Sequence, residues 1–232
     1  MDKNNITYKA SRVNQALLKC WGSPQLKRYP RVLDALVETI LSQNTSDSNS
    51  HRAYLSLKKQ FPGWKSAASA RPQAIEAAIR TGGLAKIKSL RISKLLKLIT
   101  EEQGRVSLEY LKELSPEKAY HKLLFYHGVG PKTAACTLLF GAGMPVFPVD
   151  THVYRVCQRL GWVFPRESAE KFQERIGPSI KPEKVFSLHI NLIEHGRRIC
   201  HPRRPDCGRC CLRTNCKYPK DSKPKNLKEE RP

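Results

Sequence analysis

Apolar residues recur at spacings of three and four along most of the chain, which is the spacing of one face of an α-helix. In the segment 32–41 the pattern selects Val32, Leu33, Leu36, Val37, Ile40 and Leu41. In the segment 84–99 the same pattern selects Leu84, Ile87, Leu90, Leu95 and Ile99. We expect both segments to form amphipathic helices that bury these residues.

Helix signals also occur where the periodicity is weaker. Ser115, followed by Pro116, predicts a helix start with serine as the N-cap and proline at the first helical position. The segment 185–193 alternates enough to suit a strand, but its flanks and its helical context favour a helix. No strand hairpin or run of strands is evident, so the predicted fold class is all-α.

The charge of the chain indicates its kind of partner. Lysine and arginine outnumber aspartate and glutamate by 42 to 20, which gives a formal net charge of +22 and favours a polyanion, with nucleic acid first. The sequence contains no apolar run of about 18 or more residues and no basic amphipathic helix with an aromatic face, which argues against a membrane partner. The N-terminal residues lack the apolar centre of a secretory signal. We therefore expect an intracellular protein, in the cytoplasm and nucleoid, or in the nucleus of a eukaryote.

The eight cysteines should be reduced in such a compartment, so clustered ones are better explained as metal ligands than as disulfides. Cys20, Cys136 and Cys157 are scattered among apolar neighbours, and we expect them to be small buried side chains. The spacing C-x6-C-x2-C-x5-C joins the remaining ligand candidates, Cys200, Cys207, Cys210 and Cys216. Four thiolates at this spacing suit zinc or a 4Fe-4S cluster, and Cys211 falls outside the pattern.

Arginines surround the cysteine cluster. They are Arg197, Arg198, Arg203, Arg204, Arg209 and Arg213. A cross-linked loop would present them to phosphates at low entropic cost. The cluster would also hold together a segment that has too few apolar residues for a core of its own.

The segment HGVGPKTA, 127–134, places two glycines and a lysine between two predicted helices. Gly128 and Gly130 permit a tight reversal and leave main-chain N–H groups open to a phosphate, although a purely structural corner explains them as well. Lys132 is by default a solvated surface charge. Against a DNA backbone its amine becomes a candidate nucleophile, provided that neighbouring groups or desolvation help it lose a proton.

An aspartate follows the lysine after eighteen residues. Asp150 comes directly before a predicted helix with the apolar positions Val153, Val156 and Leu160, where an aspartate commonly serves as the N-cap. A capping carboxylate is rigidly oriented and kept ionised by the helix dipole, as a group that stabilises a developing cation should be. The two roles are compatible.

Together, HGVGPKTA and the following VDTH resemble the helix-hairpin-helix, Gly/Pro-rich loop and aspartate signature of the endonuclease III family of DNA glycosylases. In that family the residue at the position of Lys132 is the nucleophile and the one at Asp150 assists it. The cysteine spacing is similar to the family's iron-sulfur loop, which implies a 4Fe-4S cluster rather than zinc. The chain departs from the family's leucine-proline before the first glycine, because it has Tyr126 and His127.

The resemblance covers about residues 10–217 and implies a two-domain architecture. A six-helix barrel with the helix-hairpin-helix would span 25–144. Residues 1–24 and 145–217 would form the iron-sulfur cluster domain, with the cleft between the domains joining nucleophile and aspartate. Residues 218–232, rich in proline and charge, are predicted to be a disordered basic tail.

An enzyme of this kind flips the target nucleotide out and fills the gap. In the family a glutamine after an apolar helix fills it. In LSQNTSD an ungapped alignment places Asn44 there and Gln43 one residue before it, and polar caps at a helix end explain both equally well. Leu84 resembles the family's apolar wedge, although an ordinary core role suits it too.

The resemblance implies a monomeric, bifunctional DNA glycosylase and AP lyase that acts on double-stranded DNA with a damaged base or an abasic site. Oxidised pyrimidines are the family's commonest targets, while relatives act on mismatched thymine, uracil or methylated cytosine. A non-catalytic helix-hairpin-helix DNA-binding protein and a redox or regulatory iron-sulfur protein are the alternatives from other classes.

Overall fold

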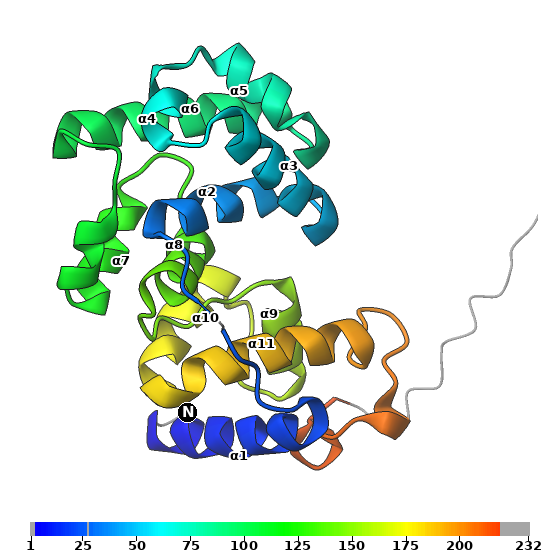
Figure 1. Ribbon diagram of the computed structural model, residues 1–232. Coiled ribbons are helices and arrows are strands. Elements are labelled where there is room, and N and C mark those ends of the chain that lie inside the picture. The colour runs from blue at the N-terminus through cyan, green and yellow to red at the C-terminus, as the bar shows by residue number, and fades with distance from the viewer. Residues whose placement is uncertain (1–2, 27, 219–232) are drawn as a thin grey trace, which may run out of the picture. The chain divides into compact units, whose positions relative to one another are not determined.

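The computed structural model describes residues 3–26 and 28–218 (Figure 1). Helices make up 69% of the structure, and no strand occurs in these described ranges. The all-α prediction is therefore confirmed. The chain divides into two compact units, which we call the cysteine unit (the described residues of Met1–Gln25 and Val149–Pro232) and the hairpin unit (those of Leu26–Pro148).

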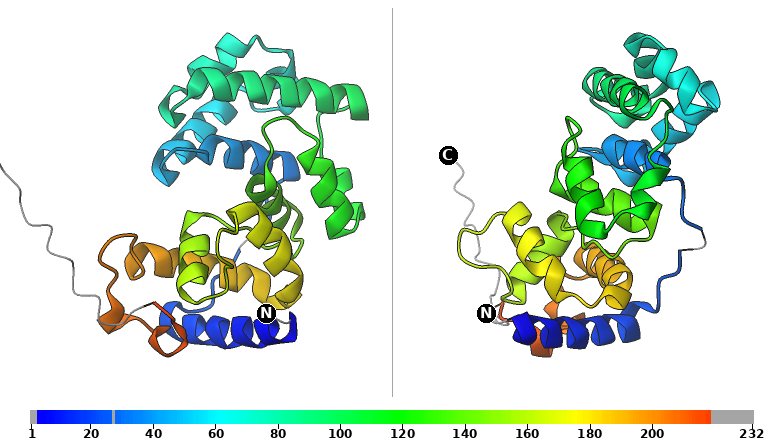
Figure 2. Two further views of the ribbon diagram at one scale, coloured as in Figure 1. Left: turned by 180° about the vertical axis from the view of Figure 1, so that it is seen from behind. Right: turned by 90° about the vertical axis from the view of Figure 1, so that its left-hand side faces the viewer.

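The hairpin unit is built around a contiguous apolar core. Its α-helices are α2 (Val32–Ser42), α3 (Asp47–Gln60), α4 (Trp64–Ser69), α5 (Pro72–Ala78), α6 (Ala85–Gln103), α7 (Pro116–Leu124) and α8 (Pro131–Thr137). Shorter helical turns are η1 (Arg80–Gly82), η2 (Glu109–Glu113) and η3 (Leu138–Ala142). α2 packs against α3 and α8, while α4 and α5 pack along α6 (Figures 1 and 2).

The prediction for α2 is confirmed and the one for α6 is partly wrong. All six apolar residues selected in α2 are buried. In α6 the selected residues Leu95 and Ile99 are buried, but Leu84, Ile87 and Leu90 are 52%, 48% and 44% exposed. The buried face of α6 continues towards its N-terminus through Ile92, Ser89 and Lys88 instead, because the stripe of residues that contacts the core is displaced around the helix.

Ser115 begins α7 as its sequence predicts. Its Oγ accepts a hydrogen bond of 3.3 Å from the backbone N–H of Lys118, and Pro116 occupies the first turn, where its missing N–H costs nothing. The capping prediction is confirmed, and it fixes the direction in which the polypeptide enters the hairpin.

The cysteine unit contains α1 (Lys3–Trp21), α9 (Thr151–Arg159), α10 (Ala169–Ile176) and α11 (Pro182–Arg198), with the turns η4 (Gly177–Ser179), η5 (Cys207–Arg209) and η6 (Arg213–Asn215). α11 packs against both α1 and α9, and α1 runs beside it in Figures 1 and 2. The segment 185–193 lies inside α11, so the choice of helix over strand is confirmed.

Two of the three scattered cysteines are buried as expected. Cys136 and Cys157 lie in the two cores, and burial raises the pKa of Cys157 strongly. Cys20 is exposed, which corrects the expectation. It lies in the last turn of α1, where its free thiol is hydrogen-bonded to the thiol of Cys211 rather than packed among apolar groups.

Most of the predicted tail, residues 219–232, lies outside the described residues. Tyr218, the first residue of that prediction, is half-buried, and the guanidinium carbon of Arg159 lies 4.4 Å from its ring centroid. Within the described part of the chain, no helix is long and apolar enough to cross a bilayer.

Candidate DNA interface and active site

The hairpin consists of α7, a turn at 125–130, and α8. Gly128 has φ +85°, which favours glycine, and a Cβ added there would meet Cδ of Arg91 at 3.1 Å, so that the arginine side chain would have to shift. Gly130 is different, because it is the N-cap of α8 with φ −88°, which any residue can adopt. A Cβ on Gly130 would meet nothing within 4 Å, so the main chain there is open to an approaching group.

Lys132 is the second residue of α8. Its side chain is half-buried, and the residues that follow it, 133–137, are all buried where α8 packs against α2. This packing fixes the position of the lysine backbone. No hydrogen bond or ion pair engages the Lys132 amine within the part of the chain that the structure describes. The amine is therefore available to an external partner.

Gln43 ties the end of α2 to the hairpin. Its Nε2 donates to the carbonyl oxygen of Gly128 at 3.3 Å and to Oγ1 of Thr133 at 3.1 Å. Its Oε1 accepts from Nη1 of Arg91 at 3.1 Å. Both ends of the amide are thus used inside the hairpin unit. Arg91, which sequence reasoning missed, supports Gln43 and lies against Gly128.

Asn44 and Leu84 share a conformation that is uncommon outside glycine. Asn44 has φ 52° and Leu84 has φ 49°, and both side chains are exposed. Backbone strain of this kind concentrates at functional sites. Of the two polar candidates at the end of α2, Gln43 is engaged by its neighbours, whereas the Asn44 side chain projects from a tight turn.

Tyr126 shows what the departure from the family's leucine-proline does. Its ring is 2% exposed, and its hydroxyl donates to Oε2 of Glu102 at 2.9 Å. Burial and the bond to Glu102 raise the pKa of Tyr126 strongly, so it stays protonated and donating. The hairpin is thereby joined to the last turn of α6. No signal in the sequence paired these two residues.

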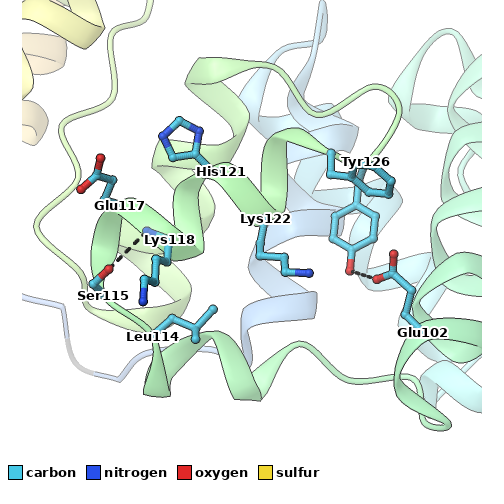
Figure 3. Close-up of a pocket in the computed structure, with 9 residues that line it drawn as sticks. Glu102, Leu114, Ser115, Glu117, Lys118, His121, Lys122 and Tyr126 are labelled. Atoms are coloured by element: carbon cyan, nitrogen blue, oxygen red, sulfur yellow. Dashed lines mark hydrogen bonds between the residues drawn. The ribbon is translucent and has the colours of Figure 1, made fainter.

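A cavity of about 770 Å³ lies beside this contact, between α7 and the end of α6. Figure 3 shows the residues that line it. Its lining includes Glu102, Lys118, His121 and Phe125. None of the site residues predicted from the sequence lines it, so this cavity is separate from the candidate active site.

Asp150 lies in the cysteine unit and is the N-cap of α9. Its Oδ1 accepts from the backbone N–H of Val153 at 2.7 Å, so the capping prediction is confirmed. The preceding backbone is fixed as well, because the N–H of Val149 donates to Oε1 of the buried Gln173 at 2.9 Å. One carboxylate oxygen is thus committed to the cap at the positive end of a helix. Asp150 and Lys132 belong to different units, and their pairing stays a prediction.

Two arginines of α9 hold the start of the cysteine loop. Arg155 donates from Nε to the carbonyl oxygen of Cys200 at 2.8 Å. Arg159 donates from Nη1 to Sγ of Cys200 at 3.1 Å and to the carbonyl oxygen of His201 at 2.8 Å. The Cys216 thiol donates in turn to the carbonyl oxygen of Arg159 at 3.3 Å. Sequence reasoning missed both arginines, which stand four residues apart on one helix face.

The four patterned cysteines lie near one another. Burial raises the pKa of Cys210 to about 11, and the thiols of Cys200, Cys216 and Cys207 add to that rise. Such mutual repulsion between thiolates is what a cationic centre would relieve. No group of three or more His, Cys, Asp or Glu side chains within the described ranges is arranged to hold a single metal ion. Four neighbouring thiols are a donor set that suits zinc or a 4Fe-4S cluster.

His195 lies beside this loop on α11. It is 1% exposed, and its Nε2 is 3.4 Å from Sγ of Cys210. Burial lowers the pKa of His195 to about 4, so its imidazole is neutral at neutral pH. The six arginines predicted to surround the loop are all exposed, as a surface that meets phosphates requires.

A helical hairpin with open main chain, on a strongly basic all-α chain, defines a helix-hairpin-helix protein. The chain belongs to the HhH-GPD superfamily of base excision DNA repair proteins, whose family model matches residues 37–182. The resemblance to the endonuclease III family is thereby confirmed.

Several curated relatives support this placement. The chain is 44% identical over 169 residues to a provisionally named DNA glycosylase of Arabidopsis thaliana, a match that covers 73% of this chain and 57% of that protein. It is 32% identical over 200 residues to endonuclease III of Thermotoga maritima, covering 83% of this chain and 89% of that protein. It is also 27% identical over 172 residues to the DNA glycosylase/AP lyase ROS1 of Arabidopsis thaliana, 67% of this chain and 12% of that protein.

Solved structures agree on the fold. A non-covalent complex of endonuclease III with DNA superposes with a TM-score of 0.75 at 23% identity, covering 93% of this chain and 95% of that chain. A thermostable thymine-DNA glycosylase gives a TM-score of 0.73 at 18% identity, covering 94% and 98%. These similarities show that the chain has the fold of HhH-GPD glycosylases.

Proposed function

We propose that the protein is a bifunctional DNA glycosylase and AP lyase that uses Lys132 as its nucleophile. The observation that carries the proposal is the unpartnered amine at the start of α8, held by a packed helix beside the open main chain of Gly130. A relative with 32% identity is an endonuclease III, and another is named a DNA glycosylase/AP lyase.

The reaction begins when the lone pair of the Lys132 amine forms a bond to C1′ of the damaged nucleotide. The glycosidic bond breaks, and its electron pair leaves with the base, which takes up a proton. The sugar ring opens to give a Schiff base between the lysine nitrogen and C1′. Loss of a proton from C2′ then expels the 3′ phosphate by β-elimination, and water releases the enzyme.

Asp150 would assist the deprotonation of Lys132 or stabilise the cationic sugar. The capping bond holds its Oδ1 and so orients the whole carboxylate, which leaves Oδ2 for this role. The backbone at Gly128 and Gly130 would bind phosphate, and the net charge of +22 would attract the double-stranded DNA partner to a monomeric enzyme.

We assign to Asn44 and Leu84 the filling of the gap that the flipped nucleotide leaves in the duplex. The Gln43 amide is already used by Gly128, Thr133 and Arg91, so we assign it the support of the hairpin and assign Asn44 the contact with the orphaned base. Leu84, 52% exposed at the start of α6, would enter the duplex as the apolar wedge.

A 4Fe-4S cluster bound by Cys200, Cys207, Cys210 and Cys216 is the cofactor that we propose. It would supply a rigid cross-link for a loop with little apolar content, and it would present the exposed arginines to phosphates. Iron and acid-labile sulfide contents of four each per chain would support the cluster, whereas one zinc ion per chain would overturn it.

Borohydride reduction in the presence of abasic DNA tests the nucleophile, because only a Schiff base is trapped as a covalent adduct. We expect the wild-type protein to be trapped and Lys132→Ala to give no adduct. Lys122→Ala removes an exposed lysine from the other helix of the hairpin, and we expect it to be trapped like the wild type. A wild-type protein that binds abasic DNA without forming an adduct would be a non-catalytic binder.

For the substrate we propose oxidised pyrimidines in duplex DNA. A panel of duplexes with one lesion each, scored for strand cleavage, compares oxidised pyrimidine with mismatched thymine, uracil and methylated cytosine. Preference for any of the last three would replace this choice of lesion while keeping the chemistry. Such an activity belongs where DNA is held, in the cytoplasm and nucleoid or in the nucleus.

A further inference from the structure

The N-terminal part of α6 buries a lysine and exposes aliphatic side chains. Lys88 is 1% exposed, while Leu84, Ile87 and Leu90 around it are between 44% and 52% exposed. Burying an ammonium group costs free energy unless its donors are satisfied. The buried ammonium group of Lys88 therefore needs hydrogen-bond acceptors around it.

The ammonium of Lys88 joins two turns that are far apart in the sequence. Its Nζ donates to the carbonyl oxygen of Leu41 at 2.6 Å, to Oγ1 of Thr45 at 2.7 Å, and to the carbonyl oxygen of Gly82 at 2.8 Å. Three acceptors match the three N–H donors of a lysine. The Thr45 hydroxyl also contacts the carbonyl oxygen of Gly82, so the two turns are bonded directly as well.

Each of these turns carries one of the proposed gap-filling residues. Leu41 and Thr45 flank the turn that holds Asn44 in its left-handed conformation. Gly82 lies two residues before Leu84, which has the same left-handed conformation at the start of α6. The lysine therefore binds both strained turns from inside the hairpin unit while their side chains face outwards.

We propose that Lys88 is a positioning residue that holds the Asn44 turn and the Leu84 turn as one preformed unit for insertion into the duplex. This inference rests on the proposed function and extends it. With both turns fixed before DNA arrives, their ordering entropy is lost on folding rather than on binding. Without the ammonium, the two turns would adopt their inserted geometry only when bound.

The test measures binding to two duplexes of one sequence, one with a tetrahydrofuran abasic analogue and one undamaged. Neither can form a Schiff base, so chemistry does not interfere. We expect Lys88→Met to lower the preference for the abasic duplex about tenfold, or about 1.4 kcal/mol, with little change on the undamaged one. Lys94→Met removes an exposed lysine from the same helix, and we expect its preference to stay within about twofold of the wild type.

The energetic coupling between Lys88 and Leu84 distinguishes a positioning role of Lys88 from a general effect on stability. If Lys88 acts through the wedge, Leu84→Ala should cost much less preference in the Lys88→Met background than in the wild type. 2-Aminopurine opposite the abasic site reports the same step, and its fluorescence rise on binding should fall in Lys88→Met. Additive effects of the two substitutions, or an unchanged preference in Lys88→Met, would overturn the proposal.

Thr45→Val provides a milder variant, which keeps the test available if Lys88→Met does not fold. It removes one of the three acceptors and preserves the side-chain shape, so we expect a smaller loss of preference in the same direction. Borohydride trapping of the wild-type protein decides the proposed function separately. A trapped wild type with an unaffected Lys88→Met would refute the positioning role alone.

Discussion

α2 and α6 lie in the same unit and have similar apolar periodicity, yet they use it differently. All six apolar positions of α2 face the core. At α6, the N-cap Leu84 and the helix residues Ile87 and Leu90 are exposed, whereas Lys88 is buried. α2 meets apolar neighbours along its length, whereas the first turns of α6 lie over the polar carbonyl groups of two turns. Periodicity predicts burial only where the facing surface is apolar too.

A matched pair of isoleucines tests this difference most strongly. Ile40 of α2 is 1% exposed and Ile87 of α6 is 48% exposed. We expect Ile40→Ala to lower the free energy of unfolding by about 2–5 kcal/mol because it opens a cavity in the core. We expect Ile87→Ala to change it by no more than about 0.5 kcal/mol. Urea denaturation followed by circular dichroism measures both, and equal losses would contradict the comparison.

A matched pair of lysines gives a smaller effect. Lys88→Met removes one hydrogen-bond donor from each of three polar acceptors, two of them main-chain carbonyls, and we expect a loss of about 1–3 kcal/mol in the free energy of unfolding. Lys94→Met, at an exposed position of the same helix, should stay within about 0.5 kcal/mol of the wild type. The same denaturation experiment reports both variants. A more stable Lys88→Met would show that the site tolerates an apolar side chain.

The smallest expected effect is a pH dependence. Burial, and secondarily the charge of Arg91, lower the pKa of Lys88 below the ordinary lysine value. Between the lowered pKa and the ordinary value the unfolded chain binds more protons, so stability rises with pH in that alkaline window. The free energy of unfolding of the wild type minus that of Lys88→Met should therefore increase as pH rises through the window. A decrease would mean that the hydrogen bonds to the three acceptors raise the pKa of Lys88 more than burial lowers it.

The fold was accessible from the sequence because its signals are local. The periodicity of α2, the Ser115 cap and the context of 185–193 depend on neighbours within a few residues, and the structure agrees with each. The cap at Asp150 is of the same kind. The hairpin was recognisable because a positive φ at Gly128 leaves few alternatives to glycine.

The contacts that support the site were not accessible, because they join distant segments through single side chains. Lys88 reaches Leu41 across 47 positions, and Gln43 reaches Thr133 across 90. One signal was available in α6: residues 92, 96 and 99 belong to a stripe that extends back to 88, which marks that lysine as inward-facing. For Tyr126 and Glu102 no comparable signal existed, since neither residue type indicates its partner.

α9 has the capping carboxylate at one end and, one and two turns further on, the arginines that grip the cysteine loop. The helix therefore connects the cysteine loop to Asp150. Damage to the loop would release Arg155 and Arg159 and let the far end of α9 pivot. A change in the orientation of the Asp150 carboxylate would then accompany loss of the loop.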